Sequence, residues 1–549
     1  MSSAKRKPIP LVPLAFVVAV VAFAWWRFSD NTVDNDLWGH VLYGQRMIAL
    51  GHVETRDPFS WTAGGSAWIN HEVLAEVALG GVHQLAGGTG LWLLSVATAV
   101  LTIVLAWREV RREATEPGIG LTFAALFAVS TNGIASGFSA RPQLFTMVAL
   151  VALLGQMRRL YAGSRVPLIV VPLLCWIWIN THGGVLAGLL LLAIAALVTL
   201  GHRLTPQFRL LAYFSRRNFD EERYFAVPRR GSGTLFLTAT VLAVLAALVT
   251  PWGPASLGWL ISSVSYLRPE ITEWQPTPID FATLPFWFMV LVSVAAWLWS
   301  RRPHRAWEAA ALAVLLVMAI RHQRHVPLFG VANLVLTPPH LLDFLRGLAG
   351  GIPDLLERLR SLRTQVTLSI LLILAAVAAV AASFWAPREE PWTMEVERDQ
   401  FPCAALDFLG EHPLDGNLLV FFDWGQQAMW ELPRNPVSFD GRLDTIYPRD
   451  VIQAHWQFYR GDTFDPAVLD LSRADVALLP TNRGGMTLLR RLGWTLVYTD
   501  PLASVLVRRV DQYPDLATMT LPVRGGSEAV SGREPFPAEP SARANPGNL

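Results

Sequence analysis

The chain consists of long apolar runs separated by shorter segments that carry most of its charge. A transmembrane helix needs about 20 mostly apolar residues, and eleven runs come close to that length. They are residues 9–28, 90–107, 118–136, 138–157, 167–181, 183–201, 232–250, 282–300, 306–321, 326–345 and 366–385. The pattern predicts a mainly α, polytopic membrane domain over residues 1–385, with about eleven transmembrane helices.

The segments that interrupt this pattern predict three kinds of region outside the bilayer. Residues 29–89 and 251–281 are too polar to be spans and form long loops. In residues 386–510, short β-like runs alternate with helix-like stretches, which predicts a small soluble α/β domain. Residues 511–549 are rich in Pro, Gly, Ser, Ala and Glu, and this composition predicts a disordered tail.

Composition narrows the class of protein. Of the 549 residues, 52% are hydrophobic and only 16% are charged, whereas about 25% are charged in soluble domains. Folding alone could not hide so much apolar surface from water, which excludes a cytosolic enzyme, a nucleic-acid binder and a secreted domain. The two cysteines, Cys175 and Cys403, indicate neither a disulfide framework nor a zinc site.

The positions of the basic residues predict the orientation of the spans. Lys and Arg are concentrated at the N-terminus and in alternate connections between spans, and the remaining connections hold few. Because cytoplasmic loops carry the excess of Lys and Arg, we expect a cytoplasmic N-terminus. An odd number of spans then places residues 386–510 outside the cytoplasmic membrane, on the same side as loops 29–89 and 251–281.

The first outer loop begins with two acidic residues, Asp34 and Asp36, directly after the first span. In an extended segment their side chains point to the same side. Paired carboxylates there could act as a general base or hold a divalent cation. Asp36 has a second interpretation, as the N-cap of an amphipathic helix over residues 37–50. No capping role explains Asp34.

Further polar residues lie near the outer ends of other predicted spans. His71 and Glu72 belong to a second amphipathic helix and could bind substrate or a metal, or lie on its solvated face, to which we assign Glu76. Asn180 and His182 end the fifth span, where polar groups are costly unless they face a cavity. A capped helix end is the competing interpretation of that pair.

Two other segments add an aromatic residue and several cations. Glu273 and Trp274 could bind a sugar by hydrogen bonding and ring stacking, although a plain interfacial helix would also explain them. Arg321 and Arg324 follow the ninth span and suit a lipid phosphate, with snorkelling as the alternative. Arg141 lies in the turn between the third and fourth spans. Because all these segments map to the outer side, the sequence predicts one site at the outer membrane interface.

An acidic pair after the first span, a long first outer loop, many spans and an outer C-terminal domain resemble the GT-C superfamily of membrane glycosyltransferases. Several short strings resemble, more closely, a bacterial group of GT-C-like membrane proteins. They are residues 36–40, 57–60, 68–72, 178–183, 273–274, 416–417, 423–425 and 440–442. The resemblance extends over residues 1–510.

The resemblance implies an inverting transfer of a sugar from a polyprenyl-phosphate-linked donor to a glycan, lipid or protein acceptor of the cell envelope. Asp34 or Asp36 would be the catalytic base, and Arg321 and Arg324 would stabilise the leaving phosphate. Whether Mg²⁺ or Mn²⁺ takes part stays open, with the two Asp as its ligands if it does. The implied substrate-binding residues are His71, Glu72, Arg141, Asn180, His182, Glu273, Trp274, Arg321 and Arg324.

Two other functions compete with this one: a transporter or flippase of lipid-linked glycans, and a non-catalytic scaffold for envelope assembly. A transporter should carry charges near the bilayer midplane and often internal repeats. Here the charges gather at one interface and no repeat is evident, which favours the enzyme. In the C-terminal domain, Asp423, Trp424 and Trp430 could bind an acceptor glycan, or the two Trp could be core residues.

Overall fold

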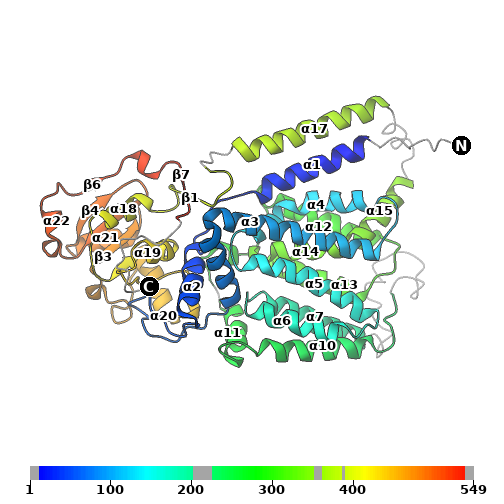
Figure 1. The fold of residues 1–549 in the computed structure, drawn as a ribbon, viewed down its shortest axis with the longest axis horizontal. Coiled ribbons are helices and arrows are strands. Elements are labelled where there is room, and N and C mark those ends of the chain that lie inside the picture. Colours follow the sequence, from blue (N-terminus) through cyan, green and yellow to red (C-terminus); the bar gives the residue numbers. More distant parts are fainter. Residues whose placement is uncertain (1–10, 202–225, 267, 351–361, 386–389, 538–549) are drawn as a thin grey trace.

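The computed structural model describes residues 11–201, 226–266, 268–350, 362–385 and 390–537. Apolar helices form a bundle, and a smaller domain containing a β-sheet lies at one end of it (Figure 1). The helices that build the bundle are α1 (Leu11–Phe28), α3 (Val73–Glu113), α4 (Ile119–Ala135), α5 (Gln143–Tyr161), α6 (Pro167–Ile179), α7 (Val185–Gly201), α10 (Ser232–Ala247), α12 (Leu284–Trp299), α13 (Ala306–Arg321), α14 (Val326–Leu336), α15 (Pro338–Gly350) and α17 (Leu362–Trp385).

Each predicted span contains a helix, but the predicted number of spans is not confirmed. Five described helices are long and apolar enough to cross a membrane: Leu11–Phe28, Val73–Glu113, Ile119–Phe138, Gln143–Tyr161 and Thr364–Ser383. A sixth span results if Gln323–Leu336 and Pro338–Gly350, which are bent by 65°, count as one. Four other apolar helices, Pro167–Ile179, Val185–Gly201, Ser232–Ala247 and Leu284–Trp299, have 17 residues or fewer.

The predicted first outer loop is largely helical. Helix α2 (Leu37–Leu50) packs against the first part of α3 and lies across the end of the bundle, between the bundle and the smaller domain (Figure 1). The backbone of α3 is non-helical at Ala86 and Gly87, where Gly87 has a φ of 56° that suits glycine. This kink separates the part of α3 that accompanies α2 from the part that continues into the bundle.

Helices α2 and α3 approach each other closely at two glycines. A Cβ atom on Gly44 would overlap the backbone oxygen of Glu76, and one on Gly80 would lie 2.6 Å from the backbone nitrogen of Gln45. Such distances are shorter than real Cβ contacts. The absence of both side chains therefore sets the distance between the two helices.

We expect Gly80→Ala to destabilise the protein by about 1–3 kcal/mol, because overpacking of a tight contact forces backbone shifts. Gly81→Ala is the matched control: its Cβ would meet only Cδ1 of Ile48, at 3.7 Å. Since alanine is favoured over glycine within helices, the control should be neutral or slightly stabilising. Thermal unfolding midpoints in detergent measure both variants, and equal losses in the two would contradict the close-approach explanation.

The smaller domain is the predicted α/β unit. Its five-stranded sheet has the order β2-β3-β5-β4-β6, in which β2 pairs with β3 and β4 with β6 in parallel, and the other neighbours are antiparallel. The strands are β2 (Leu418–Val420), β3 (Val476–Pro480), β4 (Thr495–Thr499), β5 (Ala503–Val507) and β6 (Val523–Arg524), and the longer helices are α18 (Cys403–Glu411), α19 (Gly425–Glu431), α20 (Arg449–Arg460) and α21 (Gly484–Arg491). A separate pair, β1 (Glu395–Glu397) and β7 (Arg533–Pro535), is antiparallel.

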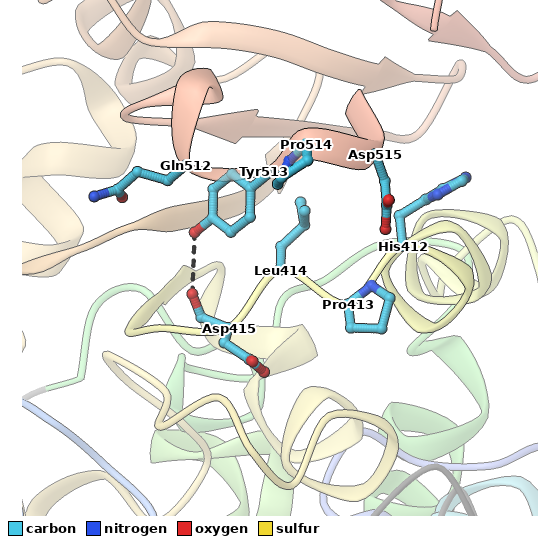
Figure 2. A pocket seen from close by; sticks show the side chains of 8 residues that line it. All are labelled: His412, Pro413, Leu414, Asp415, Gln512, Tyr513, Pro514 and Asp515. Carbon is cyan, nitrogen blue, oxygen red and sulfur yellow. Dashed lines mark hydrogen bonds between the residues drawn. The ribbon is translucent and has the colours of Figure 1, made fainter. Parts of the chain in front are cut away.

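A cavity of about 320 Å³ lies on this domain, between the end of α18 and the segment before α22 (Pro514–Ala517) (Figure 2). The hydroxyl of Tyr513 donates to the backbone oxygen of Asp415 at 3.0 Å across it. The lining residues are His412, Pro413, Leu414, Asp415, Gln512, Tyr513, Pro514 and Asp515. None of the residues that the sequence singles out for the site is among them.

The segment for which composition predicts a disordered tail is described up to residue 537. It contains short helical turns and the strands β6 and β7. Phe536 is buried, and its ring lies 4.5 Å from that of Trp38 and 5.3 Å from that of His83. Leu516 is buried as well, and composition averaged over the whole segment conceals both apolar anchors. Residues 538–549 lie outside the described residues.

A buried ion-pair network joins the first loop to the C-terminal domain. Arg442 donates to Oδ1 of Asp57 at 2.6 Å and to both carboxylate oxygens of Asp440 at 2.9 and 2.7 Å. The hydroxyl of Tyr447 donates to Asp440 at 2.5 Å. The Asp57 and Asp440 side chains are fully buried, and that of Arg442 is 3% exposed. Two of the short strings that resemble the GT-C-like group thus meet across 385 residues of sequence.

Aromatic rings surround the same guanidinium. Its central carbon lies 5.0 Å from the ring centroid of Phe59, 5.1 Å from that of Trp68 and 5.6 Å from that of Tyr43. Buried residues of α2, of the first loop and of the C-terminal domain belong to one hydrophobic cluster. The C-terminal domain is therefore anchored on the first loop by a shared core.

Candidate functional site

Most of the predicted site residues meet where the bundle faces the C-terminal domain. They come from segments far apart in the sequence. These are the residues before α2, the start of α3, the turn before α5, the turn between α6 and α7, and the 3₁₀ turns η2 (Thr272–Trp274) and η3 (Gln323–His325).

Asp34 and Asp36 share one guanidinium. The Nε atom of Arg141 donates to Oδ1 of Asp34, and its Nη2 atom lies 3.1 Å from Oδ2 of Asp36. The same Oδ1 of Asp34 also accepts the backbone N–H of Asp36 at 3.0 Å. Asp36 occupies the N-cap position of α2, but its side chain makes no capping hydrogen bond. Its carboxylate therefore belongs to the ion-pair cluster and not to the helix start.

The two carboxylates differ in their surroundings and in their hydrogen-bond donors. Burial raises the pKa of Asp36; the charge of Arg141 opposes this rise, and the charge of Asp34 adds to it. Asp34 is held by two donors, the guanidinium and a backbone amide. The geometry thus distinguishes a carboxylate with proton affinity, Asp36, from one that orients its neighbours, Asp34.

From Arg141 the ion pairs continue into the second outer loop. Its Nη1 atom lies 3.4 Å from Oε2 of Glu273, whose Oε1 atom lies 3.6 Å from Nη1 of Arg324. The guanidinium carbons of Arg324 and Arg268 each lie 4.3 Å from the ring centroid of Trp274. Arg268 is neutralised by Asp444 at 2.8 Å, whereas Arg324 has only the longer contact with Glu273. Arg324 is therefore the cation of this group that is most available to an anionic ligand.

A second cluster surrounds Glu72. Its Oε1 atom lies 3.6 Å from Nε2 of His71 and 3.9 Å from Nε2 of His182, and its Oε2 atom lies 3.9 Å from Nδ1 of His40. The same His40 nitrogen lies 3.3 Å from Oε1 of Glu76. Burial raises the pKa of Glu72 to about 7. Burial also lowers the pKa of His40, but its hydrogen bond with Glu76 and the charge of Glu72 outweigh this effect and raise it to about 9.

The C-terminal domain contributes Asp423 to the edge of the site. Burial raises the pKa of Asp423 to about 6; the charge of Asp36 adds to this rise, and a hydrogen bond with Asn35 opposes it. Nearby, the backbone N–H of Gly39 donates to Oε1 of Gln426 at 3.2 Å. The first loop and the C-terminal domain thus enclose the carboxylates together.

Four of the residues that the sequence offered as binding residues lie outside the ion pairs of the site. Asn180 donates to the backbone oxygens of Trp176 and Val249 and so ties the end of α6 to the end of α10, which fits the capped helix end. Arg321 is exposed and takes no part in the ion pairs of the described residues. Trp424 and Trp430 are buried core residues, so neither offers a surface to a glycan.

His40 and Glu76 join the site although sequence reasoning did not select them as site residues, and Asp423, which the sequence offered only as a candidate for binding an acceptor glycan, lies beside the acidic pair. Glu76, which the pattern assigns to a solvated face, is 2% exposed. The sequence spacing could have identified His40 and Glu76. His40 lies four residues after Asp36, and Glu76 lies four residues after Glu72, so each shares a helix face with a selected residue. For Asp423 the sequence offered only an acidic residue among aromatics, with no indication of what it faces.

No protein-family model matches the sequence, and no curated protein matches it. The structure does match solved membrane proteins. The apo oligosaccharyltransferase of Archaeoglobus fulgidus aligns with a TM-score of 0.52 and 13% identity over 87% of this chain and 70% of that chain. The same enzyme tethered to an acceptor peptide with the NVT sequon aligns with a TM-score of 0.48 and 14% identity, over 85% of this chain and 68% of that chain. ArnT from Cupriavidus metallidurans bound to undecaprenyl phosphate aligns with a TM-score of 0.45 and 14% identity, over 90% of this chain and 97% of that chain.

The first of these likenesses shows the fold. The chain is a membrane protein with a GT-C-like fold, which it shares with this oligosaccharyltransferase. The predicted fold class and the resemblance to the GT-C superfamily are confirmed at the level of the fold, and the match does not test the short strings. At 13% identity the match says nothing about which residues act, so the chemistry must come from the site itself.

Proposed function

We propose that the protein is a membrane glycosyltransferase that transfers a sugar from a polyprenyl-phosphate-linked donor to an envelope acceptor at the outer face of the cytoplasmic membrane. The observation that carries the proposal is the continuous series of ion pairs from Asp34 and Asp36 through Arg141 and Glu273 to Arg324. It joins a half-buried carboxylate, Asp36, whose side chain is 33% exposed, to an available cation at the end of an apolar bundle. The GT-C fold supports it.

In this reaction Asp36 is the base and Asp34 is a positioning residue. The acceptor hydroxyl transfers its proton to the Asp36 carboxylate while its oxygen forms a bond to the anomeric carbon. The bond between that carbon and the phosphate oxygen breaks, and its electron pair leaves with the polyprenyl phosphate. Attack opposite the leaving group inverts the configuration at the anomeric carbon. Asp34 holds Arg141, and so keeps Asp36 in place.

The leaving phosphate needs a cation, and Arg324 is the best placed. Its guanidinium lies over Trp274, which orients it, and among the described residues its one acid partner is Glu273, 3.6 Å away. A guanidinium can bind two phosphate oxygens at once. Charge that develops on the phosphate in the transition state is stabilised most by donors that are already oriented. Asp423 lies on the side of the C-terminal domain, where the acceptor would approach.

We expect Arg324→Gln to lower kcat/KM for transfer from a radiolabelled polyprenyl-phosphate sugar by about 10- to 100-fold, because hydrogen bonds to charged groups contribute about 1.5–3 kcal/mol. Arg321→Gln is the matched control, since it removes an exposed arginine three positions earlier in the chain. The control should transfer at the wild-type rate. Equal rates in both variants and in the wild type would remove Arg324 from the site.

The same assay tests the proposed function itself. Wild-type protein in membranes should transfer label from the donor to an envelope acceptor. Donor binding without any transfer would instead favour a transporter or flippase of lipid-linked glycans, or a non-catalytic scaffold.

A further inference from the structure

We propose that His40, Glu72 and Glu76 form a binding site for a divalent metal ion, distinct from the Asp34–Asp36 pair. One ligand atom of each residue lies within 4.8 Å of those of the other two. The Nδ1 atom of His40 is 3.3 Å from Oε1 of Glu76 and 3.9 Å from Oε2 of Glu72. The proposal rests on this geometry and does not depend on the transfer reaction.

The separations suit a common metal. Zinc binds His nitrogen and carboxylate oxygen at about 2.0–2.2 Å in tetrahedral sites, which puts two ligand atoms about 3.3–3.6 Å apart. The His40–Glu76 distance already has this value. The Glu72 side chain, 17% exposed, needs to move only slightly to bring its oxygen equally close to His40. Three protein ligands leave a fourth position for water or a substrate oxygen.

The surroundings orient the two glutamates as outer groups do in metal sites. The Nδ2 atom of Asn70 donates to Oε2 of Glu76, so that Oε1 faces His40. The Oδ1 atom of Asn70 accepts the backbone N–H of Glu72 at 3.0 Å. The close approach of α2 and α3 brings His40 within reach of both. One buried asparagine, 4% exposed, therefore orders the whole ligand set.

Charge balance favours an ion here over one at the acidic pair. Asp34 and Asp36 already have the guanidinium of Arg141. Among the residues that the structure describes, the ion-pair partners of Glu72 and Glu76 are histidines.

His182 supports the cluster without being a ligand. Its Nδ1 atom accepts the backbone N–H of Gly184 at 3.0 Å. The neutral ring therefore carries its proton on Nε2, the nitrogen that lies 3.9 Å from Oε1 of Glu72. At that distance this N–H makes no hydrogen bond, and it lies near the Glu72 oxygen that does not face His40. A His and two carboxylates form a nitrogen and oxygen ligand set that suits Zn²⁺ or Mn²⁺.

Metal binding by the purified full-length chain tests the proposal. The protein, stripped with a chelator in detergent, is dialysed against Zn²⁺ alone or Mn²⁺ alone, and bound metal is measured by mass spectrometry. We expect one ion per wild-type chain. Asn70→Ala should weaken affinity by about 10- to 100-fold, the usual effect of losing an outer hydrogen bond. His40→Gln and Glu76→Gln, which remove ligands, should weaken it at least as much.

Glu54→Gln is the matched control, because Glu54 is a glutamate of the same loop that pairs with Arg46 at 2.8 Å. It should bind metal like the wild type. The wild-type unfolding midpoint should rise with Zn²⁺ concentration, since an ion that binds only the folded state stabilises it. This measurement does not depend on whether a variant folds.

A wild-type chain that holds no ion would overturn the proposal and leave a protonated His40 between two glutamates. Affinity unchanged in His40→Gln and Glu76→Gln would overturn it as well. Neither donor nor acceptor enters these measurements, so either result leaves the proposed transfer reaction standing.

Discussion

Asp36→Asn is expected to lower the rate of sugar transfer by about 10²- to 10⁴-fold, the contribution that a general base typically makes. Asparagine has nearly the same shape and keeps an acceptor oxygen for Arg141, so the protein should still fold and insert. Asp34→Asn should lower the rate less, because Asp34 positions Arg141 and the backbone of Asp36 and takes no proton. Initial rates at saturating donor, normalised to the amount of inserted protein, rank the two variants.

The pH profile supplies an independent measure of the same assignment. The base must be ionised to accept a proton, so the wild-type rate should fall as the pH decreases through the pKa of Asp36. Burial raises that pKa, so the loss should begin at a higher pH than for an ordinary Asp, whose pKa is about 3.9. Wild-type rates in both variants would remove the pair from the mechanism, and the opposite ranking would make Asp34 the base.

Arg442→Met should destabilise the protein by about 3–5 kcal/mol, the usual cost of removing one partner of a buried ion pair. Methionine fills much of the space among Tyr43, Phe59 and Trp68 but leaves Asp57 and Asp440 as buried charges without a cation. We expect a lower thermal unfolding midpoint in detergent and faster proteolysis of the C-terminal domain.

Arg460→Met is the control for this variant. Arg460 pairs with Asp462 at 2.8 Å, but its side chain is 47% exposed, and exposed pairs contribute about 0–1 kcal/mol. Similar unfolding midpoints for Arg442→Met, Arg460→Met and the wild type would show that the buried network does not hold the domain in place.

Much of the helical framework could be predicted from the sequence, because a chain in a bilayer must satisfy its backbone within each apolar segment. Apolar runs therefore translate directly into helices, from α1 to α17. The number of spans could not be obtained in this way. The bend of 65° between Gln323–Leu336 and Pro338–Gly350, and the short lengths of α6 and α12, are local features that hydropathy averages conceal.

Individual candidate residues of the site could be selected from the sequence, but the contacts between them could not be predicted. Asp34, Asp36 and Glu72 stand out as acidic residues beside apolar runs. That Arg141 lies between the acidic pair and Glu273 follows only from how α5 and the second outer loop pack, across 107 and 132 residues. The contact of Asp423 with the site could not be predicted either, because the position of the C-terminal domain is set by side chains of the first loop.

The buried network between Asp57 and Arg442 has a consequence for how the chain is made. The two residues are separated by 385 positions. At synthesis rates of about 5–20 residues per second, Asp57 emerges roughly 20–80 s before its guanidinium partner. During that interval the first loop has its carboxylate and its aromatic side chains but not the group that fills the space among them. The C-terminal domain thus completes the core of the first loop, so the loop that carries Asp34 and Asp36 can reach its final packing only after Arg442 has been synthesised.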